Sequence, residues 1–310
     1  MTESFGGYKN MKKFFIAVFV LFVSISSVFA VTAEDYRATA YKGDADAQYG
    51  LGWCYAKGMG VAQNYFEAVK WFRKSAAQGN ADAQCYLGYC YENGFGVEKD
   101  LFEAVNWYRK SAARGNASGQ YNLGFCYAEG KGLTQNYFEA VKWFRKSATQ
   151  GDADAQCYLG YCYENGFGVE KDLFEAMSWN RKSASQGNAI GQYNLGICYA
   201  EGKGLTQNYF EAVKWFRKSA AQGNADAQCY LGYCYENGFG VEKDLFEAGN
   251  WYRKSAAQDN AIGQYNLGIC YENGNGVEKD LFEAVRYYRM AAKQGYKDAK
   301  KRLNDLGETW

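Results

Sequence analysis

The stretch ADAQCYLGYCYENGFGVEKDLFEA, from Ala81 to Ala104, decides the fold of this chain. It recurs with few changes from Ala153 and from Ala225, and a sister version, which opens with YNLG, starts at Tyr121 and again at Tyr193. A repeat of fixed period indicates an architecture of similar units that stack on one another. The chain is therefore best analysed unit by unit.

Seven units of 36 residues fill residues 43–294 without an insertion. Units two, four and six belong to one type and units three and five to another, which indicates duplication of a double unit. Residues 31–42 are interpreted as an N-terminal capping half-repeat. Residues 295–310 are interpreted as a C-terminal capping helix, whose lysines give the polar outer face that the end of a repeat array needs.

Each unit carries the signals of two helices. In unit two, Asn80 can cap the first helix, and Gly94 suits the left-handed residue that follows a helix end. Asp100 and Glu103 form a capping box for the second helix. We expect Gly88, in the middle of the first helix, to mark a close approach of a packing helix, because glycine there costs about 1 kcal/mol relative to alanine.

Apolar residues recur at helical spacing in both helices of a unit. The first helix of unit two has Ala83, Leu87, Cys90 and Tyr91 on one side, and the second has Ala104, Trp107, Tyr108 and Ala112. One hairpin cannot bury both stripes, so neighbouring hairpins must stack. The sequence predicts an all-α solenoid of helical hairpins.

The N-terminal residues resemble a secretory signal. Residues 1–10 form a polar extension, Lys12 and Lys13 form a basic region, and residues 14–23 are apolar. Val28 and Ala30 are the small residues that a signal peptidase reads, so we expect a signal peptide at residues 11–30 and a secreted or periplasmic product. The alternative is an uncleaved segment that anchors the chain in a membrane.

Composition excludes several functions. The formal net charge is +1, with 35 basic and 34 acidic residues, so bulk charge favours neither nucleic acid nor, after signal cleavage, a membrane surface. The chain has no histidine, which excludes a catalytic histidine. Seven similar units offer no single asymmetric catalytic constellation. We expect a monomer that is not an enzyme and needs no cofactor or metal.

The units resemble Sel-one-like repeats, which are related to tetratricopeptide repeats. The residues that carry the resemblance in unit two are Leu87, Gly88, Tyr91, Gly94, Gly96, Asp100, Ala104, Trp107, Tyr108, Ala112 and Gly115. The resemblance implies a right-handed α/α superhelix whose concave face binds a protein or peptide, often in an adaptor. It is incomplete in two respects: family members often have proline where Glu98 stands, and Ala112 occupies the helix-two position of a cysteine that cysteine-rich relatives pair in a disulfide.

The ten cysteines all lie on predicted first helices. Cys85 and Cys90 are five residues apart on one helix, which is poor geometry for a disulfide. The cysteines are predicted either as buried free thiols or as partners in bridges between units. A zinc site is not expected, since close ligand pairs and histidine are missing.

The proposed peptide-binding residues vary regularly along the first helices. The eleventh position of each unit and the position three residues earlier are mostly aromatic or Asn, and such a ladder could bury peptide side chains and bind a peptide backbone. The alternative is that these side chains pack between units. The candidates are Trp53, Tyr86, Tyr89, Asn122, Phe125, Tyr158, Tyr161, Asn194, Tyr230, Tyr233 and Asn266.

Two other functions remain alternatives. An arginine recurs on each second helix, usually before a lysine, as at Arg73 and Lys74, and this ladder could hold a cell-envelope glycan or another anionic polymer. The simpler interpretation is that helix dipoles favour cations there. The third function, a weak penicillin-binding or β-lactamase activity, rests on relatives alone, because no Ser is followed by Lys three residues later.

Overall fold

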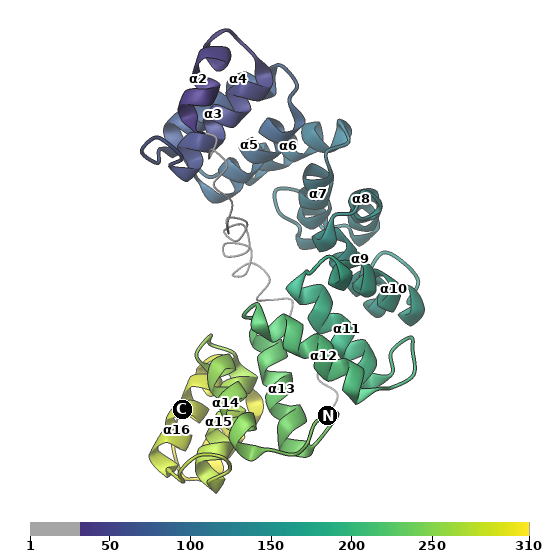
Figure 1. The fold of residues 1–310 in the computed structure, drawn as a ribbon, viewed down its shortest axis with the longest axis vertical. Coiled ribbons are helices and arrows are strands. Elements are labelled where there is room, and N and C mark those ends of the chain that lie inside the picture. The colour runs from purple at the N-terminus through teal and green to yellow at the C-terminus, as the bar shows by residue number, and fades with distance from the viewer. Residues whose placement is uncertain (1–31, 310) are drawn as a thin grey trace. The chain divides into compact units, whose positions relative to one another are not determined.

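The computed structural model describes residues 32–309, which form sixteen helices and no strand (Figure 1). The helices are α2 (Ala33–Tyr41), α3 (Ala45–Lys57), α4 (Tyr65–Ala77), α5 (Ala81–Asn93), α6 (Leu101–Ala113), α7 (Ala117–Glu129), α8 (Tyr137–Thr149), α9 (Ala153–Asn165), α10 (Leu173–Ser185), α11 (Ala189–Glu201), α12 (Tyr209–Ala221), α13 (Ala225–Asn237), α14 (Leu245–Ala256), α15 (Ala261–Asn273), α16 (Leu281–Lys293) and α17 (Lys297–Asp305). No helix of the described part is both long and apolar enough to span a bilayer. The predicted signal peptide lies outside the described residues.

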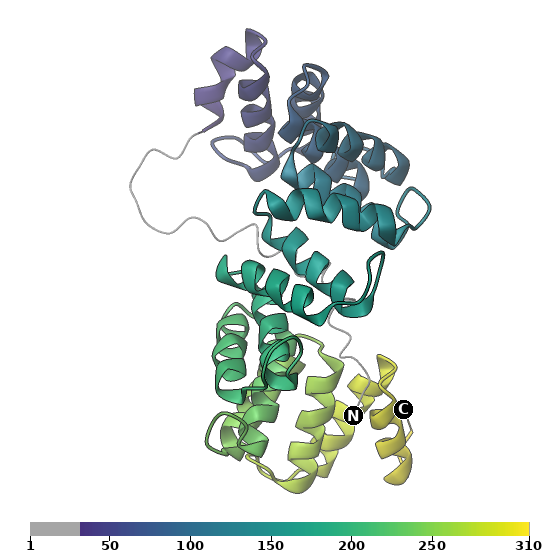
Figure 2. The ribbon, with the colours of Figure 1, turned by 90° about the vertical axis from the view of Figure 1, so that its right-hand side faces the viewer.

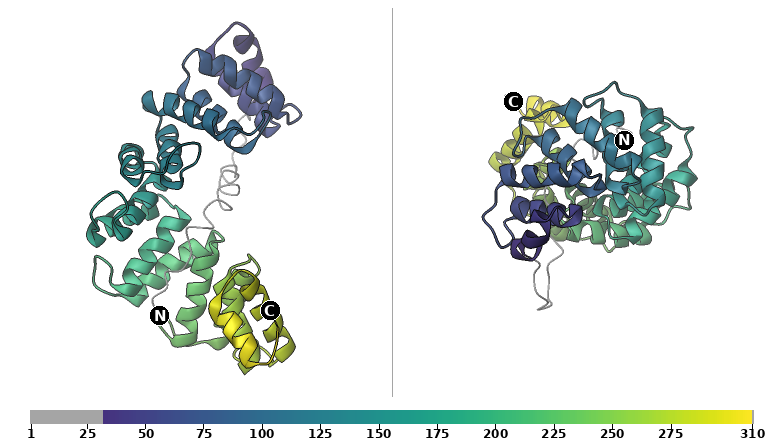
Figure 3. Two further views of the ribbon diagram at one scale, coloured as in Figure 1. Left: turned by 180° about the vertical axis from the view of Figure 1, so that it is seen from behind. Right: turned by 90° about the horizontal axis from the view of Figure 1, so that it is seen from above.

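The chain divides into two compact units, whose described parts are residues 32–179 and residues 180–309. In each, a first helix packs against the second helix of its own hairpin and against the second helix of the hairpin before it, as α5 does with α6 and α4. Figure 2 shows the hairpins from α11 to α16 in green to yellow, and Figure 3 shows the hairpins of both units from behind. The predicted all-α class with stacked hairpins of 36 residues is confirmed.

The predicted helix ends are confirmed, but the predicted capping box at Asp100 is only half formed, because the Asp100 N–H donates to the Tyr91 carbonyl and not to Glu103. The Asn80 side chain accepts a hydrogen bond from the backbone N–H of Ala83 at 2.8 Å, and Gly94 ends α5 with a φ of 78°. The Asp100 carboxylate accepts from the backbone N–H groups of Phe102 and Glu103. These contacts satisfy backbone groups that a helix end leaves without partners. Related caps recur in the other hairpins, which fixes the helix boundaries in each unit.

The core differs in one respect from the predicted apolar stripe. Ala104, Tyr108 and Ala112 of α6 are buried as expected, but Trp107 is only half-buried and Val105 takes its place in the core. Trp107 therefore lies at the edge of the predicted stripe, where neighbouring hairpins meet. Its ring packs against the side of the preceding cluster, and the Lys110 ammonium covers it at 3.8 Å from the ring centroid.

The mid-helix glycines make room for a ring of the paired second helix. A Cβ added at Gly88 would lie 2.7 Å from the Tyr108 ring and 3.1 Å from the Ala104 carbonyl oxygen. Other hairpins have the same arrangement with other fully buried rings, namely Phe72, Phe144, Phe216, Tyr252 and Tyr288. The predicted close approach is confirmed, and the element that approaches is an aromatic side chain together with a backbone carbonyl.

One hairpin lacks this ring. Asn180 of α10 stands in the register of Tyr108 and is only 1% exposed. Its amide oxygen accepts from Asn194 Nδ2 at 3.5 Å, and its amide nitrogen lies 4.0 Å from Cys198 Sγ. Both contacts are long for hydrogen bonds. The division between the two compact units falls directly before this residue.

Asp259 offers a test of local backbone strain. It opens the seventh unit with a φ of 59°, in a position where the other units have glycines such as Gly223, with a φ of 88°. A left-handed conformation costs a residue with a side chain about 1 kcal/mol. We expect Asp259→Gly to raise the free energy of unfolding by about that amount, as measured by urea denaturation. The reverse change, Gly223→Asp, should lower it, and equal stability of all three proteins would contradict this account.

Candidate functional site

The predicted peptide-binding residues all lie on first helices, but their exposure differs between the two register positions. At the eleventh position every side chain is half-buried. These residues are Trp53, Tyr89, Phe125, Tyr161, Ile197, Tyr233 and Ile269. Three residues earlier, Tyr158 and Asn194 are buried, while Tyr86, Asn122, Tyr230 and Asn266 are half-buried. The eleventh position is therefore the more accessible one.

The tyrosines at the earlier position pack on the ring of the preceding second helix. The Tyr86 centroid lies 5.0 Å from that of Phe72, and the Tyr158 and Tyr230 rings stack on Phe144 and Phe216 at the same distance. Such ring pairs contribute about 1 kcal/mol beyond the area they bury. These tyrosines join hairpins, which is the packing alternative weighed from the sequence.

The asparagines at the same position also join hairpins. Asn122 Nδ2 lies 3.4 Å from Cys85 Sγ of the preceding hairpin, and Asn266 Nδ2 lies 3.7 Å from Cys229 Sγ. Asn194 contacts Asn180 in the same way. The alternation of Tyr and Asn thus reflects two kinds of junction between hairpins: ring on ring, and amide on thiol or amide. Peptide binding by these amides stays a prediction.

The half-exposed rings at the eleventh position are held by their neighbours. Trp53 contacts Tyr86 with centroids 4.9 Å apart, Tyr86 contacts Tyr89 at 5.6 Å, and Tyr89 contacts Phe95 at 5.7 Å. The first and last of these contacts recur 72 residues later, between Phe125 and Tyr158 and between Tyr161 and Phe167. The last two recur after a further 72 residues, among Tyr230, Tyr233 and Phe239. Because their rotamers are fixed, these rings would lose little conformational entropy when a ligand covers them.

Gly94 and Gly96 lie in the loop between α5 and α6, and the structure shows why both positions have glycine. A Cβ at Gly96 would overlap the carbonyl group of Tyr65 in the preceding hairpin, and Gly96 has a φ of 67°. The intervening Phe95 stacks on the Tyr65 ring at 4.8 Å. Gly94, with a φ of 78°, is therefore required for the turn alone, and Gly96 for both the turn and the close approach between hairpins.

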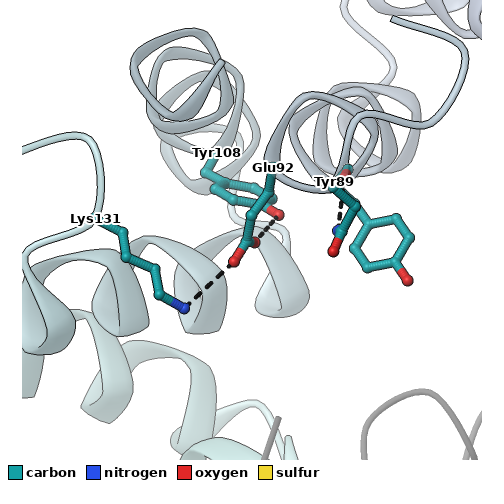
Figure 4. A network of polar contacts seen from close by, with 5 residues as sticks. Tyr89, Glu92, Tyr108 and Lys131 are labelled. Carbon is teal, nitrogen blue, oxygen red and sulfur yellow. Dashed lines mark hydrogen bonds and ion pairs between the residues drawn. The ribbon is translucent and has the colours of Figure 1, made fainter. Parts of the chain in front are cut away.

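A polar network that sequence reasoning missed surrounds Glu92 of α5 (Figure 4). The buried Tyr108 hydroxyl donates to its carboxylate at 2.9 Å, and Lys131 of the next hairpin pairs with it at 3.5 Å. The Glu92 side chain is only 15% exposed. The sequence did hold a signal: units with Tyr at the position of Tyr108 have Glu here, and units with Phe have Ala.

The network has a counterpart without a cation. Glu236 accepts a hydrogen bond from the Tyr252 hydroxyl at 2.7 Å, but Asn275 stands at the position of Lys131, and no basic side chain within residues 32–309 pairs with Glu236. We expect Asn275→Lys to raise the free energy of unfolding by about 0.5 kcal/mol, as a partly buried ion pair does. Urea denaturation would measure it. The gain should vanish in a Glu236→Gln background, and a gain that persists there would show that the ion pair is not its cause.

Several of the second-helix cations have partners within the chain. Arg73, Arg145 and Arg217 each donate to a tyrosine hydroxyl of the next hairpin at 2.8–2.9 Å. Lys74 and Lys218 lie over Trp71 and Trp215, at 4.1 and 3.9 Å from the ring centroids. These contacts give the ladder a structural role between and along helices. They do not favour its interpretation as a polymer-binding surface.

All ten cysteines are buried free thiols, in agreement with the first of the two alternatives drawn from the sequence. Burial raises the pKa of Cys85 and of Cys90 to about 12. Because the thiolate is the reactive form, these side chains are poor nucleophiles at neutral pH. They act as small apolar residues in the core.

Comparison with known proteins identifies the same repeats. The Sel1 repeat model matches seven consecutive segments, residues 45–80, 81–116, 117–152, 153–188, 189–224, 225–260 and 261–296. No curated protein matched the chain. Among solved structures it is similar to c5321, a protective antigen of uropathogenic Escherichia coli with an SLR fold, at 36% identity and a TM-score of 0.67 over 89% of this chain and 67% of that one. A Sel1 repeat protein from Oxalobacter formigenes is 34% identical, with a TM-score of 0.68 over 88% and 80% of the two chains.

Proposed function

Because the chain belongs to the Sel1 repeat family, whose helical solenoids commonly act as scaffolds for protein interactions, we propose that it binds an extended protein or peptide segment along its first helices. The observation that carries this proposal is the row of half-buried side chains at the eleventh position of each unit. Five of the seven are aromatic, and neighbouring rings hold them in place. Rigid aromatic side chains provide contact area at low entropic cost.

Catalysis is not part of this proposal. Family members are typically non-enzymatic scaffolds, and the partly buried carboxylate that the structure reveals, Glu92, is engaged by a tyrosine and a lysine. Hydrolysis of a chromogenic β-lactam by the purified protein would overturn this part of the proposal.

We also propose that the chain acts outside the cytoplasm. The signal-like residues 11–30 support this location. The relative c5321 is a protective antigen, and protection requires that an antigen be accessible to the immune system. Mass spectrometry of the protein from its native host should find a chain that starts at Val31, whereas a chain that retains residues 11–30 would support the membrane-anchored alternative.

A random dodecapeptide library displayed on phage tests the binding surface. Peptides selected on the wild-type protein should bind at least tenfold more weakly to a variant with Tyr89→Ser and Tyr161→Ser, since each change removes a ring at the centre of the proposed contact. Phe102→Ser on the second helix α6 is the matched control and should leave affinity unchanged. Equal binding by both variants would rule out the first-helix face, and affinity that falls steeply with salt would favour an anionic ligand instead.

A further inference from the structure

The helices of residues 32–179 differ in charge according to their place in the hairpin, which the net charge of +1 does not show. Each of the second helices α4, α6 and α8 has one glutamate and two or three basic residues, as α6 has Glu103, Arg109 and Lys110. The first helices α3, α5, α7 and α9 have a single basic residue, Lys57, and their acidic residues are Asp46, Asp82, Glu92, Glu129, Asp154 and Glu164. The proposed peptide site therefore lies on acidic helices.

Some of these carboxylates share a helix face with the half-buried rings at the eleventh position of each unit. A residue seven positions before such a ring, or four positions after it, lies on the same face of the helix. Asp82 precedes Tyr89 by seven residues, and Glu129 follows Phe125 by four. Three carboxylates in these registers are exposed and pair with no basic side chain within residues 32–309, namely Asp46, Asp82 and Glu129. Their charge is available to a ligand that covers the rings.

Neighbouring groups orient these carboxylates without neutralising them. The Asp82 carboxylate accepts a hydrogen bond from Asn116 Nδ2 of the next hairpin at 2.7 Å, and Asp46 has the same contact one unit earlier. A neutral amide fixes the position of a carboxylate but leaves its charge in place. Burial raises the pKa of Tyr158, and the negative charge of Glu129 raises it further. Negative charges therefore lie beside the rings of the first helices.

Two lysines of the chain show how a cation fits these rings. The Lys57 ammonium lies over Trp53, 4.9 Å from the ring centroid. The Lys131 ammonium lies 4.1 Å from the centroid of Phe125 and 3.5 Å from the Glu92 carboxylate. An ammonium in such a place is attracted both by the face of the ring and by the carboxylate. The eleventh-position rings are thus suited to receive a positive charge.

Tyr89 has no such cation. Within residues 32–309 no lysine or arginine lies over its ring, although Asp82 shares its helix face. The ring is held between Tyr86 and Phe95. A lysine or arginine of a ligand would meet an aromatic face and a fixed negative charge there. A glutamate or aspartate of a ligand would meet like charge.

We infer that the segment bound along the first helices of residues 32–179 is basic, with lysine or arginine side chains that contact the ring of Tyr89 and the carboxylates of Asp46, Asp82 and Glu129. The inference rests on the proposed function and names the chemistry of its ligand. Complementary charge of this kind favours the correct partner over acidic and neutral ones. Lys57, the one basic residue of these first helices, already covers Trp53, so the ligand's cations would bind the later rings.

The dodecapeptide library displayed on phage gives the sign of the ligand's charge, which the salt dependence of binding alone does not. Peptides selected on the mature wild-type chain should contain more lysine and arginine than the unselected library and should have a mean net charge of roughly +2 or more. Replacing each lysine of the strongest peptide by glutamine should weaken its binding about tenfold. Fluorescence anisotropy with the synthetic peptide measures this change and leaves the protein unaltered.

A charge-neutralised protein tests the carboxylates themselves. Asp46→Asn, Asp82→Asn and Glu129→Gln in one protein keep an oxygen acceptor at each position and should weaken binding of the selected peptide about tenfold. The matched control has Glu67→Gln, Glu103→Gln and Glu139→Gln on the second helices, which remove the same net charge. The control should bind the peptide like the wild type. Helicity and the urea midpoint of both variants are measured alongside.

The outcomes separate this inference from the proposed function. Selected peptides that are neutral or acidic would overturn the inference and leave binding along the first helices in place, whereas a library that yields no binder would overturn both. Equal loss of affinity in the two protein variants would show that overall charge attracts the peptide, and unchanged affinity of the glutamine peptide would show that its lysines do not contact the protein. Either result contradicts the inference.

Discussion

Replacing Phe216 by asparagine should lower the free energy of unfolding by about 4 kcal/mol. The Phe216 ring is fully buried, stacks on Tyr230 with centroids 5.0 Å apart and lies against the position where Gly196 has no Cβ. Asparagine would leave part of this space empty and would bury an amide among apolar groups. Urea denaturation followed by tryptophan fluorescence measures the effect.

The reciprocal change, Asn180→Tyr, should stabilise the chain by about 1 to 2 kcal/mol. Units two and six, which share the type of unit four, have Tyr108 and Tyr252 in this register, and the contacts of the Asn180 side chain are long. A tyrosine would replace these contacts with a buried ring. In the wild type, hydrogen exchange should be faster for the amides of α10 than for those of α8 and α12, because stability in a repeat array is a sum of local terms.

The two changes must differ in sign. If Asn180→Tyr destabilises the chain as much as Phe216→Asn does, the site of Asn180 is adapted to its amide, and the missing ring is not a weak point. Uniform exchange across α8, α10 and α12 would lead to the same conclusion. Phe216→Leu is the matched control: it keeps an apolar side chain and should cost only about half as much as the asparagine variant.

The fold could be predicted from the sequence because its determinants are local and repeated. Asn80, Gly94 and Asp100 define helix ends without reference to the rest of the molecule, and seven copies of the same spacing make the assignment redundant. Contacts between hairpins are harder to predict, since one residue can face either its own unit or the next. For the amide of Asn122 the sequence left peptide binding and packing between units as alternatives, and in the structure it lies against Cys85 of the preceding hairpin.

The contact between Glu92 and Tyr108 could have been predicted by comparing the repeats with one another. Glu92 and Glu236 occur with Tyr108 and Tyr252, while Ala128 occurs with Phe144. A hydroxyl and a carboxylate that vary together across repeats indicate contact, and the structure places them at hydrogen-bond distance. The exposure of the phenylalanine at the second residue of each second helix, such as Phe102, could not be foreseen in this way. The period alone does not reveal which side of a second helix is left without a neighbour.

The mid-helix glycines allow the most direct test of how the two helices of a hairpin fit together. We expect Gly232→Ala to destabilise the chain by about 2 kcal/mol, although alanine is the better helix former by about 1 kcal/mol. The added Cβ would lie 2.6 Å from two atoms of the Tyr252 ring. That ring is 1% exposed and tied through its hydroxyl to Glu236, so it cannot move aside without losing a hydrogen bond.

Gly249, in the second helix of the same hairpin, is the matched control. A Cβ there would meet its nearest neighbour, Val277 Cγ1, at 3.5 Å, an ordinary van der Waals contact. Five other units have valine in this register, at Val69, Val105, Val141, Val213 and Val285. Gly249→Ala should therefore raise stability by about 1 kcal/mol, measured by the same urea titration.

In a Tyr252→Leu background the Gly232→Ala penalty should shrink, because the clashing ring is gone. If both glycine variants raised stability, helix propensity alone would account for them, and the close approach of Tyr252 would carry no energetic weight.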